Sequence, residues 1–153
     1  MVIAIRPFRS DDAPQVAEIV RRCLREVNSQ DYPVEVIDRM CGHFTAARFV
    51  ELSAGRDIYI ADEGGVVGTV SRDGNKVHSM FVDPDAAGRG IGRLLMDHVE
   101  ALAAADGHEH MEAGASITAH RFYLRRGYQD VRESESGFGL TYLVRKPLRP
   151  SAA

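Results

Sequence analysis

The amino-acid sequence predicts an α/β (α+β) fold, in which a mixed and mostly antiparallel central sheet of six to seven strands is flanked by helices. Segments with the residue pattern of strands occur near both ends and in the middle of the chain, and segments with apolar residues at helical spacing lie between them. The 153 residues, of which 44% are hydrophobic and 27% charged, are typical of one globular domain. We place this domain at residues 1–147 and predict a disordered tail at 148–153.

The first third of the chain predicts one strand followed by helices. Residues 2–7 alternate apolar and polar side chains and end in proline, which is typical of an edge strand. Ser10 is predicted to cap a helix that continues to about residue 28, because a serine side chain can accept a first-turn N–H. Two shorter helical segments follow, the first ending at Gly42 and the second covering residues 45–52.

The remainder of the chain predicts strands for most of its length. Strands are expected at 58–61, 66–70 and 77–82, and the glycine-containing turns between them indicate an antiparallel meander. A helix at 91–105, a strand at 110–115, a helix at about 118–126 and an antiparallel pair at 128–133 and 138–145 are predicted to complete the fold.

Three alternating glycines, Gly88, Gly90 and Gly92, stand between a predicted strand and a predicted helix. Glycine lets the backbone approach a ligand closely, and the first N–H groups of a helix have no partner within it. With the positive end of the helix dipole they form a site for phosphate or pyrophosphate, to which Arg89 and Arg93 add positive charge. A P-loop has lysine and then serine or threonine after its last glycine, whereas Gly92 is followed by Arg93 and Leu94. The spacing also differs from the dinucleotide-binding pattern Gly-x-Gly-x-x-Gly.

The segments Met80–Leu95 and Ala115–Tyr128 resemble two motifs of the GNAT superfamily of N-acetyltransferases. The first motif is (Gln/Arg)-x-x-Gly-x-(Gly/Ala) between a strand and a helix, and the second is Asn-x-x-Ala-x-x-x-Tyr-x-x-x-Gly-(Phe/Tyr). The resemblance covers about residues 2–146, and the predicted order of elements agrees with the family fold. Two positions depart from the motifs, because Ala87 replaces the usual glutamine or arginine and Ser116 replaces the usual asparagine.

This resemblance implies that the protein moves the acetyl group of acetyl-CoA to an amine, which attacks the thioester directly. It also implies that the strand before the glycine turn pairs with the pantetheine arm, and that an N–H group of Met80 or Phe81 polarises the thioester carbonyl. The amides of the turn would bind the pyrophosphate. The residues expected to contact acetyl-CoA are Met80, Phe81, Val82, Gly88, Arg89, Gly90, Ile91, Gly92, Arg93, Ser116 and Tyr123.

Tyr123 and His78 are the expected catalytic residues. The resemblance implies that Tyr123 is the general acid for the departing thiolate. Complete proton transfer would be uphill by roughly 2 kcal/mol, since the reference pKa is about 10 for tyrosine and about 8.5 for a thiol. His78 lies two positions before Met80, and a reference pKa of about 6.5 lets it accept a proton from the amine directly or through water. Glu112, on the next predicted strand, is the alternative base.

The composition and net charge indicate which kinds of partner to expect. A net charge of −3 is unlike that of a nucleic-acid-binding domain and fits a cationic acceptor. We expect a small-molecule amine, with a protein amine as the alternative, and a homodimer is compatible with the resemblance. The sequence also predicts a cytoplasmic protein without a membrane span or a metal site. Two alternatives stay open: a non-catalytic acyl-CoA-binding or sensing domain of the same fold, and an unrelated nucleotide-binding protein.

Overall fold

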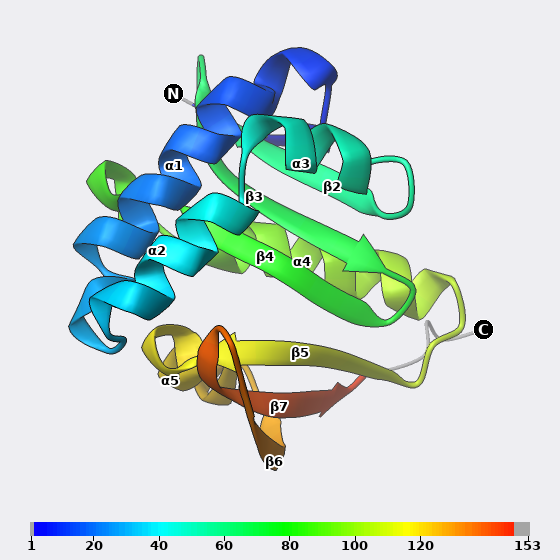
Figure 1. Cartoon of the computed structure of the whole chain (residues 1–153). Coiled ribbons are helices and arrows are strands. Elements are labelled where there is room, and N and C mark those ends of the chain that lie inside the picture. Colours follow the sequence, from blue (N-terminus) through cyan, green and yellow to red (C-terminus); the bar gives the residue numbers. More distant parts are fainter. Residues whose placement is uncertain (1, 149–153) are drawn as a thin grey trace.

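The computed structural model describes residues 2–148, which form one seven-stranded sheet with helices on both faces (Figure 1). The strands are β1 (Ala4–Pro7), β2 (Asp57–Asp62), β3 (Val66–Asp73), β4 (Lys76–Val82), β5 (His110–Ser116), β6 (Gln129–Ser136) and β7 (Gly139–Pro147). The helices are α1 (Ala13–Glu26), α2 (Val34–His43), α3 (Ala46–Leu52), α4 (Ile91–Ala105) and α5 (Ile117–Arg125). The strand order is β1-β2-β3-β4-β5-β7-β6, and every adjacent pair is antiparallel except β4 and β5. The predicted mixed, mostly antiparallel sheet is confirmed.

Two apolar clusters fix the helices on opposite faces of the sheet. Helices α1, α2 and α3 pack on one face through residues such as Val20 and Phe49, and α4 covers the other face through Leu95 and Val99 (Figure 1). All four of these side chains are fully buried. Burial of one such side chain stabilises the fold by about 1.5–3 kcal/mol, so the apolar stripe of each helix determines which way it faces.

The last two strands are paired as predicted, but β7 lies between β5 and β6. The final strand of the chain is therefore internal, and β6 forms the edge of the sheet. Composition explains this order, because β7 contributes the fully buried Val144 to the core, whereas β6 is exposed at every residue. A polar strand is suited to a sheet edge, where one of its sides faces water.

Strands β4 and β5 pair over a short distance and then diverge. Their parallel register includes only Lys76 with Glu112 and Val77 with Ala113. From residue 78 onward, the side of β4 that faces β5 has no strand partner among the described residues. An unpaired strand edge offers N–H and C=O groups to a ligand that can extend alongside it.

A β-bulge at Ser79 accompanies this divergence. The register between β3 and β4 passes from Ser71 opposite His78 to Thr69 opposite Phe81, so β4 contains one extra residue. Ser79 has φ of 51°, and it is the one non-glycine residue with positive φ within residues 2–148. A bulge bends its strand and increases the local twist, which here carries the end of β4 away from β5.

The start of α1 differs from the prediction. Ser10 does not cap this helix, because residues 10–12 form a 3-10 turn and α1 begins at Ala13. The Asp12 carboxylate accepts the Arg9 N–H at 2.7 Å and also two hydrogen bonds from Arg6. Asp12 thus closes the turn that precedes α1, but its side chain does not accept an N–H from the first turn of this helix.

Two further boundaries also differ. Gly42 lies inside α2, which continues for one more residue, so it does not end the helix. Leu148, predicted to begin a disordered tail, is buried, and its N–H donates to the Glu109 carbonyl at 2.8 Å. The rest of that predicted tail, residues 149–153, lies outside the described residues. None of the helices within residues 2–148 is long and apolar enough to cross a membrane.

Candidate active site along strand β4

Three adjoining cavities follow β4 along the opening between β4 and β5. The first, of about 570 Å³, reaches the N-terminus of α4, and we call it the α4 cavity. The second, of about 320 Å³, contains Tyr123 and is called the Tyr123 cavity. The third, of about 490 Å³, contains His78 and is called the His78 cavity. The middle cavity shares Met80 and Phe81 with the α4 cavity and Ser79 with the His78 cavity, so the three form one continuous path.

The three glycines of the turn meet two different requirements. Gly88 and Gly90 both have φ of 79°, a conformation that costs other residues about 1–2 kcal/mol. Gly92 has no such φ, but a Cβ there would lie 3.3 Å from the Phe122 ring, so this position needs a small residue for packing. The first helical bond of α4 runs from the Leu94 N–H to the Gly90 carbonyl at 3.1 Å. The N–H groups of residues 91–93 therefore have no partner within the helix.

Only one of the two predicted arginines faces the α4 cavity. Arg93 lines it beside the glycine turn. Arg89 lines none of the three cavities, and its guanidinium instead pairs with Glu63 in the turn between β2 and β3, with Nη1 and Oε1 3.0 Å apart. This pairing lowers the pKa of Glu63. The Arg89 side chain therefore points away from the α4 cavity, where it was expected to contact a pyrophosphate. Arg93 is the positively charged side chain that lines this cavity.

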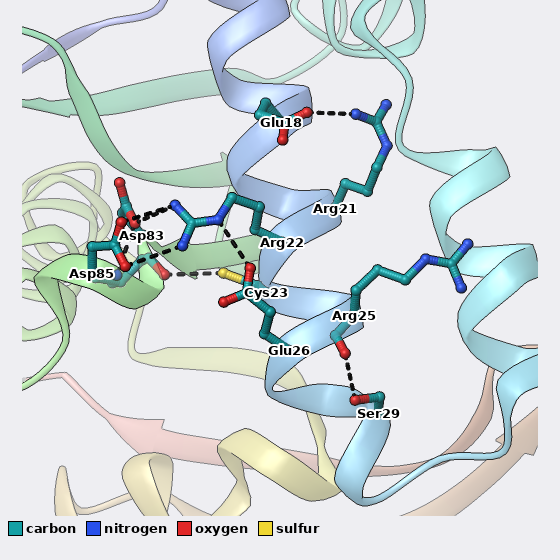
Figure 2. Close-up of polar contacts among 10 residues, drawn as sticks. Glu18, Arg21, Arg22, Cys23, Arg25, Glu26, Ser29, Asp83 and Asp85 are labelled. Carbon is teal, nitrogen blue, oxygen red and sulfur yellow. Dashed lines mark hydrogen bonds and ion pairs between the residues drawn. The ribbon is translucent and has the colours of Figure 1, made fainter.

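Helix α1 anchors the chain segment that enters the glycine turn (Figure 2). Arg22 pairs with Asp83 at 3.2 Å and with Asp85 at 3.1 Å, and the Cys23 thiol donates to the Val82 carbonyl at 3.0 Å. Cys23 is buried, and burial raises the pKa of its thiol to about 12, so this group remains a donor at neutral pH. The end of β4 is thus fixed before the turn begins.

Tyr123 is buried, with 4% of its surface exposed, and lines the middle cavity from α5. Its neighbour Tyr128 donates its hydroxyl to Glu100 at 2.9 Å, whereas the Tyr123 hydroxyl has no hydrogen-bond partner within residues 2–148. Burial raises the pKa of Tyr123, so the hydroxyl is protonated at neutral pH. A protonated and unpartnered hydroxyl in a cavity is available to donate to a ligand.

Both candidate bases line the His78 cavity and neither lines the Tyr123 cavity. Burial lowers the pKa of His78, and the positive charge of Arg56 lowers it further. The imidazole is therefore neutral and can accept a proton at neutral pH. Glu112 is paired with Arg145, with its Oε1 3.0 Å from the guanidinium. Because the Glu112 carboxylate already has an ion-pair partner, His78 is the better candidate for the base.

The other predicted contact residues are distributed over the path as follows. Met80 and Phe81 line both the α4 and the Tyr123 cavities, and Val82 lines the α4 cavity. The Ile91 side chain is buried at 1% exposure, so its backbone N–H is the group at the turn. Ser116 lines the Tyr123 cavity, but its hydroxyl caps α5 by accepting the Ala119 N–H at 3.0 Å.

Two features of the path were not predicted from the sequence. The bulge at Ser79 has no local signal, since a serine between two apolar-patterned stretches fits a regular strand. Asn28 is buried at 8% exposure and lines both the α4 and the Tyr123 cavities. Its position after α1 resembles an ordinary helix end, and only the packing of α1 against β4 places it beside the cavities.

A family model described as an acetyltransferase (GNAT) domain matches residues 25–143. The chain belongs to the GNAT family of N-acetyltransferases. It is 26% identical over 138 residues to the peptidyl-lysine N-acetyltransferase YjaB of Salmonella typhimurium, covering 88% of this chain and 89% of that one. This membership establishes an acetyl-CoA-dependent N-acetyltransferase and excludes the unrelated nucleotide-binding protein.

Solved structures agree with this family. A GCN5-related N-acetyltransferase from Rhodopseudomonas palustris matches with a TM-score of 0.88 and 27% identity, covering 97% of this chain and 99% of that one. The PaiA N-acetyltransferase of Thermoplasma acidophilum, solved in complex with coenzyme A, matches with a TM-score of 0.80 and 15% identity over 96% and 99% of the two chains. The predicted GNAT fold is confirmed.

Proposed function

We propose that this GNAT protein holds acetyl-CoA along β4 and transfers the acetyl group to a small-molecule amine in the His78 cavity. The pyrophosphate binds at the N-terminus of α4, where the N–H groups of residues 91–93 and the helix dipole attract an anion. Arg93 adds the only full positive charge among the residues described as lining that cavity. Because Ala87 has no polar side chain, the backbone supplies most of the hydrogen bonds to the phosphates.

The pantetheine arm lies along the free edge of β4. Its amide groups extend this edge as an added strand would, since β5 has already diverged there. The bulge leaves Ser79 and Met80 without partners in the β3 register, and in this proposal the N–H of Met80 points at the thioester oxygen. An N–H in this position stabilises the oxyanion that forms when the amine attacks. The Val82 carbonyl already accepts the Cys23 thiol, which orients it for a second donor from the arm.

The transfer itself takes place beside Tyr123. The amine lone pair forms a C–N bond to the thioester carbon, and the C–S bond then breaks, so that coenzyme A leaves as a thiolate. Tyr123 donates a hydrogen bond to this sulfur. Because burial raises the tyrosine pKa, stabilisation by that hydrogen bond accounts for its role better than complete proton transfer does. The proton lost by the amine passes to His78 directly or through water, with Glu112 as the alternative.

One observation carries this proposal: a buried tyrosine without a hydrogen-bond partner lies midway between a pyrophosphate site and a cavity that contains a neutral histidine. A non-catalytic acyl-CoA sensor needs the pyrophosphate site but neither the unpartnered tyrosine nor the neutral histidine. A protein lysine is the second candidate acceptor, because the relative YjaB is a peptidyl-lysine N-acetyltransferase.

The substitution Tyr123→Phe tests the catalytic part. We expect thiol release from acetyl-CoA with an amine panel to fall by a factor of about 10² to 10⁴, since a positioned proton donor contributes on that order. Thermal-shift titration should show that the variant still binds acetyl-CoA, and that NAD stabilises neither protein. Full activity in the variant would exclude the role of Tyr123. No thermal shift of the unmodified protein with acetyl-CoA would contradict the binding site.

A further inference from the structure

The His78 cavity is lined by an excess of positive charge. Arg48 comes from α3, Arg56 from the segment between α3 and β2, Lys76 from the start of β4, and Arg132 from β6. Among the described lining residues Glu112 is the one carboxylate. The whole chain has a net charge of −3, so this concentration of cations is local and is not a property of the molecule.

Most of this charge is not neutralised within the protein. Arg56, Lys76 and Arg132 form no ion pair within residues 2–148. Arg48 pairs with Glu51 at 3.2 Å on the exposed side of α3, a contact that water screens. Glu112 is itself paired with Arg145 outside the lining. An anion that enters the cavity would therefore meet cations without competing partners.

The histidines of the cavity respond to these cations. Burial lowers the pKa of His78, with smaller contributions in the same direction from Arg56 and Lys76, while Asp73 opposes them. Burial also lowers the pKa of His43, helped by Arg48 and Arg56. His43 lines the Tyr123 cavity as well, so the positive potential extends toward the reaction centre. The cations from separate elements thus act on one common space.

These cations do not serve the phosphates of acetyl-CoA. The His78 cavity shares no described lining residue with the α4 cavity, and the Tyr123 cavity separates the two. The glycine turn and Arg93 already form an anion site at the far end of the path. The cations therefore lie on the acceptor side of the thioester.

We propose that the acceptor is a small primary amine that carries an anionic group, a carboxylate or a phosphate, at the end opposite the amine. This inference rests on the proposed function and names its substrate class. The anionic group is held by Arg56, Lys76 and the neighbouring arginines, and the amine extends past His78 toward the thioester. A cavity of about 490 Å³ is within the range of small-molecule sites. The whole-chain charge pointed to a cationic acceptor, and the local charge at the cavity reverses that expectation.

The same cations assist the reaction. An amine is a nucleophile only without its extra proton, and nearby positive charge lowers the pKa of an ammonium group. Held by its anionic end, the acceptor places its amine in this potential, and the ammonium proton leaves through the neutral His78 or through water. A protein lysine without an adjacent acid would gain the lowered pKa but no attraction, and a diamine would be repelled.

Matched amines test the proposal. Values of kcat/KM are measured with saturating acetyl-CoA for 4-aminobutanoate against butylamine, for 2-aminoethyl phosphate against ethanolamine, and for lysine peptides with and without a flanking aspartate. In the first two pairs we expect the anionic amine to be preferred over its partner, and over both peptides, by about tenfold or more, which corresponds to about 1.4 kcal/mol. Equal or better turnover of butylamine, a diamine or the peptides would overturn the proposal.

Charge-removing variants locate the effect. Arg56→Gln and Lys76→Gln should each raise KM for the anionic amines by about tenfold and leave KM for acetyl-CoA unchanged. Arg21→Gln is the matched control, because Arg21 is exposed on α1, pairs with Glu18 and lines none of the three cavities. An equal effect of Arg21→Gln, or no effect of the other two, would show that the cavity cations do not bind the acceptor.

Failure of the inference can be distinguished from failure of the proposed function. Absence of acetyl-CoA binding would count against the proposed function, whereas turnover of only neutral or cationic amines would count against the acceptor class. If no amine in the panel is turned over, calorimetric titration of the CoA-bound protein with 2-aminoethyl phosphate decides the matter. Binding that is lost in Arg56→Gln supports the proposal, and absence of binding by the unmodified protein overturns it.

Discussion

At the scale of single residues, burial sets the charge state of the groups along β4. The thiol of Cys23 and the hydroxyl of Tyr123 both have raised pKa values and remain donors, whereas His78 has a lowered pKa and remains an acceptor. The same physical cause acts in both directions, because removing water disfavours the charged form of any group. Tyr123 as a donor and His78 as an acceptor are the two groups that the proposed acetyl transfer requires, whereas the Cys23 thiol holds the end of β4.

The substitution His78→Gln tests the base. Since the folded protein lowers the pKa of His78, its neutral form is present above that pKa and is lost as pH falls through it. We expect kcat/KM of the unmodified protein to decline on acidification with an apparent pKa below about 6.5. In the variant, kcat/KM should no longer decline on acidification, and the rate should be lower by a factor of about 10² to 10⁴.

His98→Gln is the matched control, because His98 also has a pKa lowered by burial but lies on α4 against Tyr59, away from the cavities. Its pH profile should equal that of the unmodified protein. An acid limb that survives in His78→Gln would assign the base to Glu112 or to water.

At the scale of elements, the glycine turn and the bulge solve different parts of one problem. The turn brings backbone N–H groups to the surface at the start of α4, and the bulge releases the backbone of β4 from its neighbour. In both the turn and the bulge, the groups offered to the ligand belong mainly to the backbone and not to charged side chains. The loss of a polar side chain at Ala87 is therefore tolerable, because fixed backbone dipoles at a helix N-terminus bind phosphate without it.

Two glycine-to-alanine substitutions should have opposite effects on stability. Gly90→Ala places a Cβ at φ of 79°, so we expect a loss of about 1–2 kcal/mol in the free energy of unfolding and weaker binding of acetyl-CoA. Gly42→Ala lies inside α2 with no atom within 4 Å of the added Cβ, so a gain of up to about 1 kcal/mol is expected. Urea denaturation and acetyl-CoA titration measure both.

A loss of stability in Gly42→Ala would contradict the account of α2. Unchanged acetyl-CoA affinity in Gly90→Ala would remove the turn from the binding site.

At the scale of the whole molecule, Tyr32 joins segments that are far apart in the sequence. Its hydroxyl donates to the Leu140 carbonyl of β7 at 2.7 Å and accepts the Ile117 N–H at the start of α5 at 2.8 Å. Its ring occupies the space beside Gly139, where a Cβ would approach to 2.8 Å. The connection between α1 and α2 thereby positions α5, the helix that carries Tyr123.

Tyr32→Phe should lower both stability and turnover. Both backbone partners of the hydroxyl lose their bond, and an unsatisfied buried group costs about 1–3 kcal/mol. Turnover should fall with it, because the position of α5 is less well defined.

Tyr142→Phe is the control, since the Tyr142 hydroxyl has no hydrogen bond within residues 2–148 and its ring stacks on His120 at 3.8 Å in either case. Its stability should change by less than about 0.5 kcal/mol. An equal loss in both variants would show that the hydroxyl of Tyr32 has no special role.

The sequence by itself determined most of the elements and the family, and it suggested where an anion would bind, because each depends on local patterns. Apolar spacing identifies α1 and α4, turn glycines identify the meander, and Gly88, Gly90 and Gly92 identify the helix N-terminus at which we propose that phosphate binds. These signals lie within a few residues of one another, so neighbouring side chains suffice to interpret them. The predicted cap at Ser10 was wrong, because residues 10–12 form a 3-10 turn in which Asp12 accepts the Arg9 N–H, and α1 begins only at Ala13.

Only the tertiary structure decided which residues surround the proposed acceptor site. The cations of the His78 cavity span residues 48–132 and come from four separate segments, so no window of the sequence contains them together. The same holds for the pairing of Arg89 with Glu63, a partner for this side chain that the sequence did not predict. The bulge at Ser79 and the insertion of β7 between β5 and β6 belong here too. Each depends on contacts between distant segments, and the free energy of such contacts is set by packing, which local propensity does not encode.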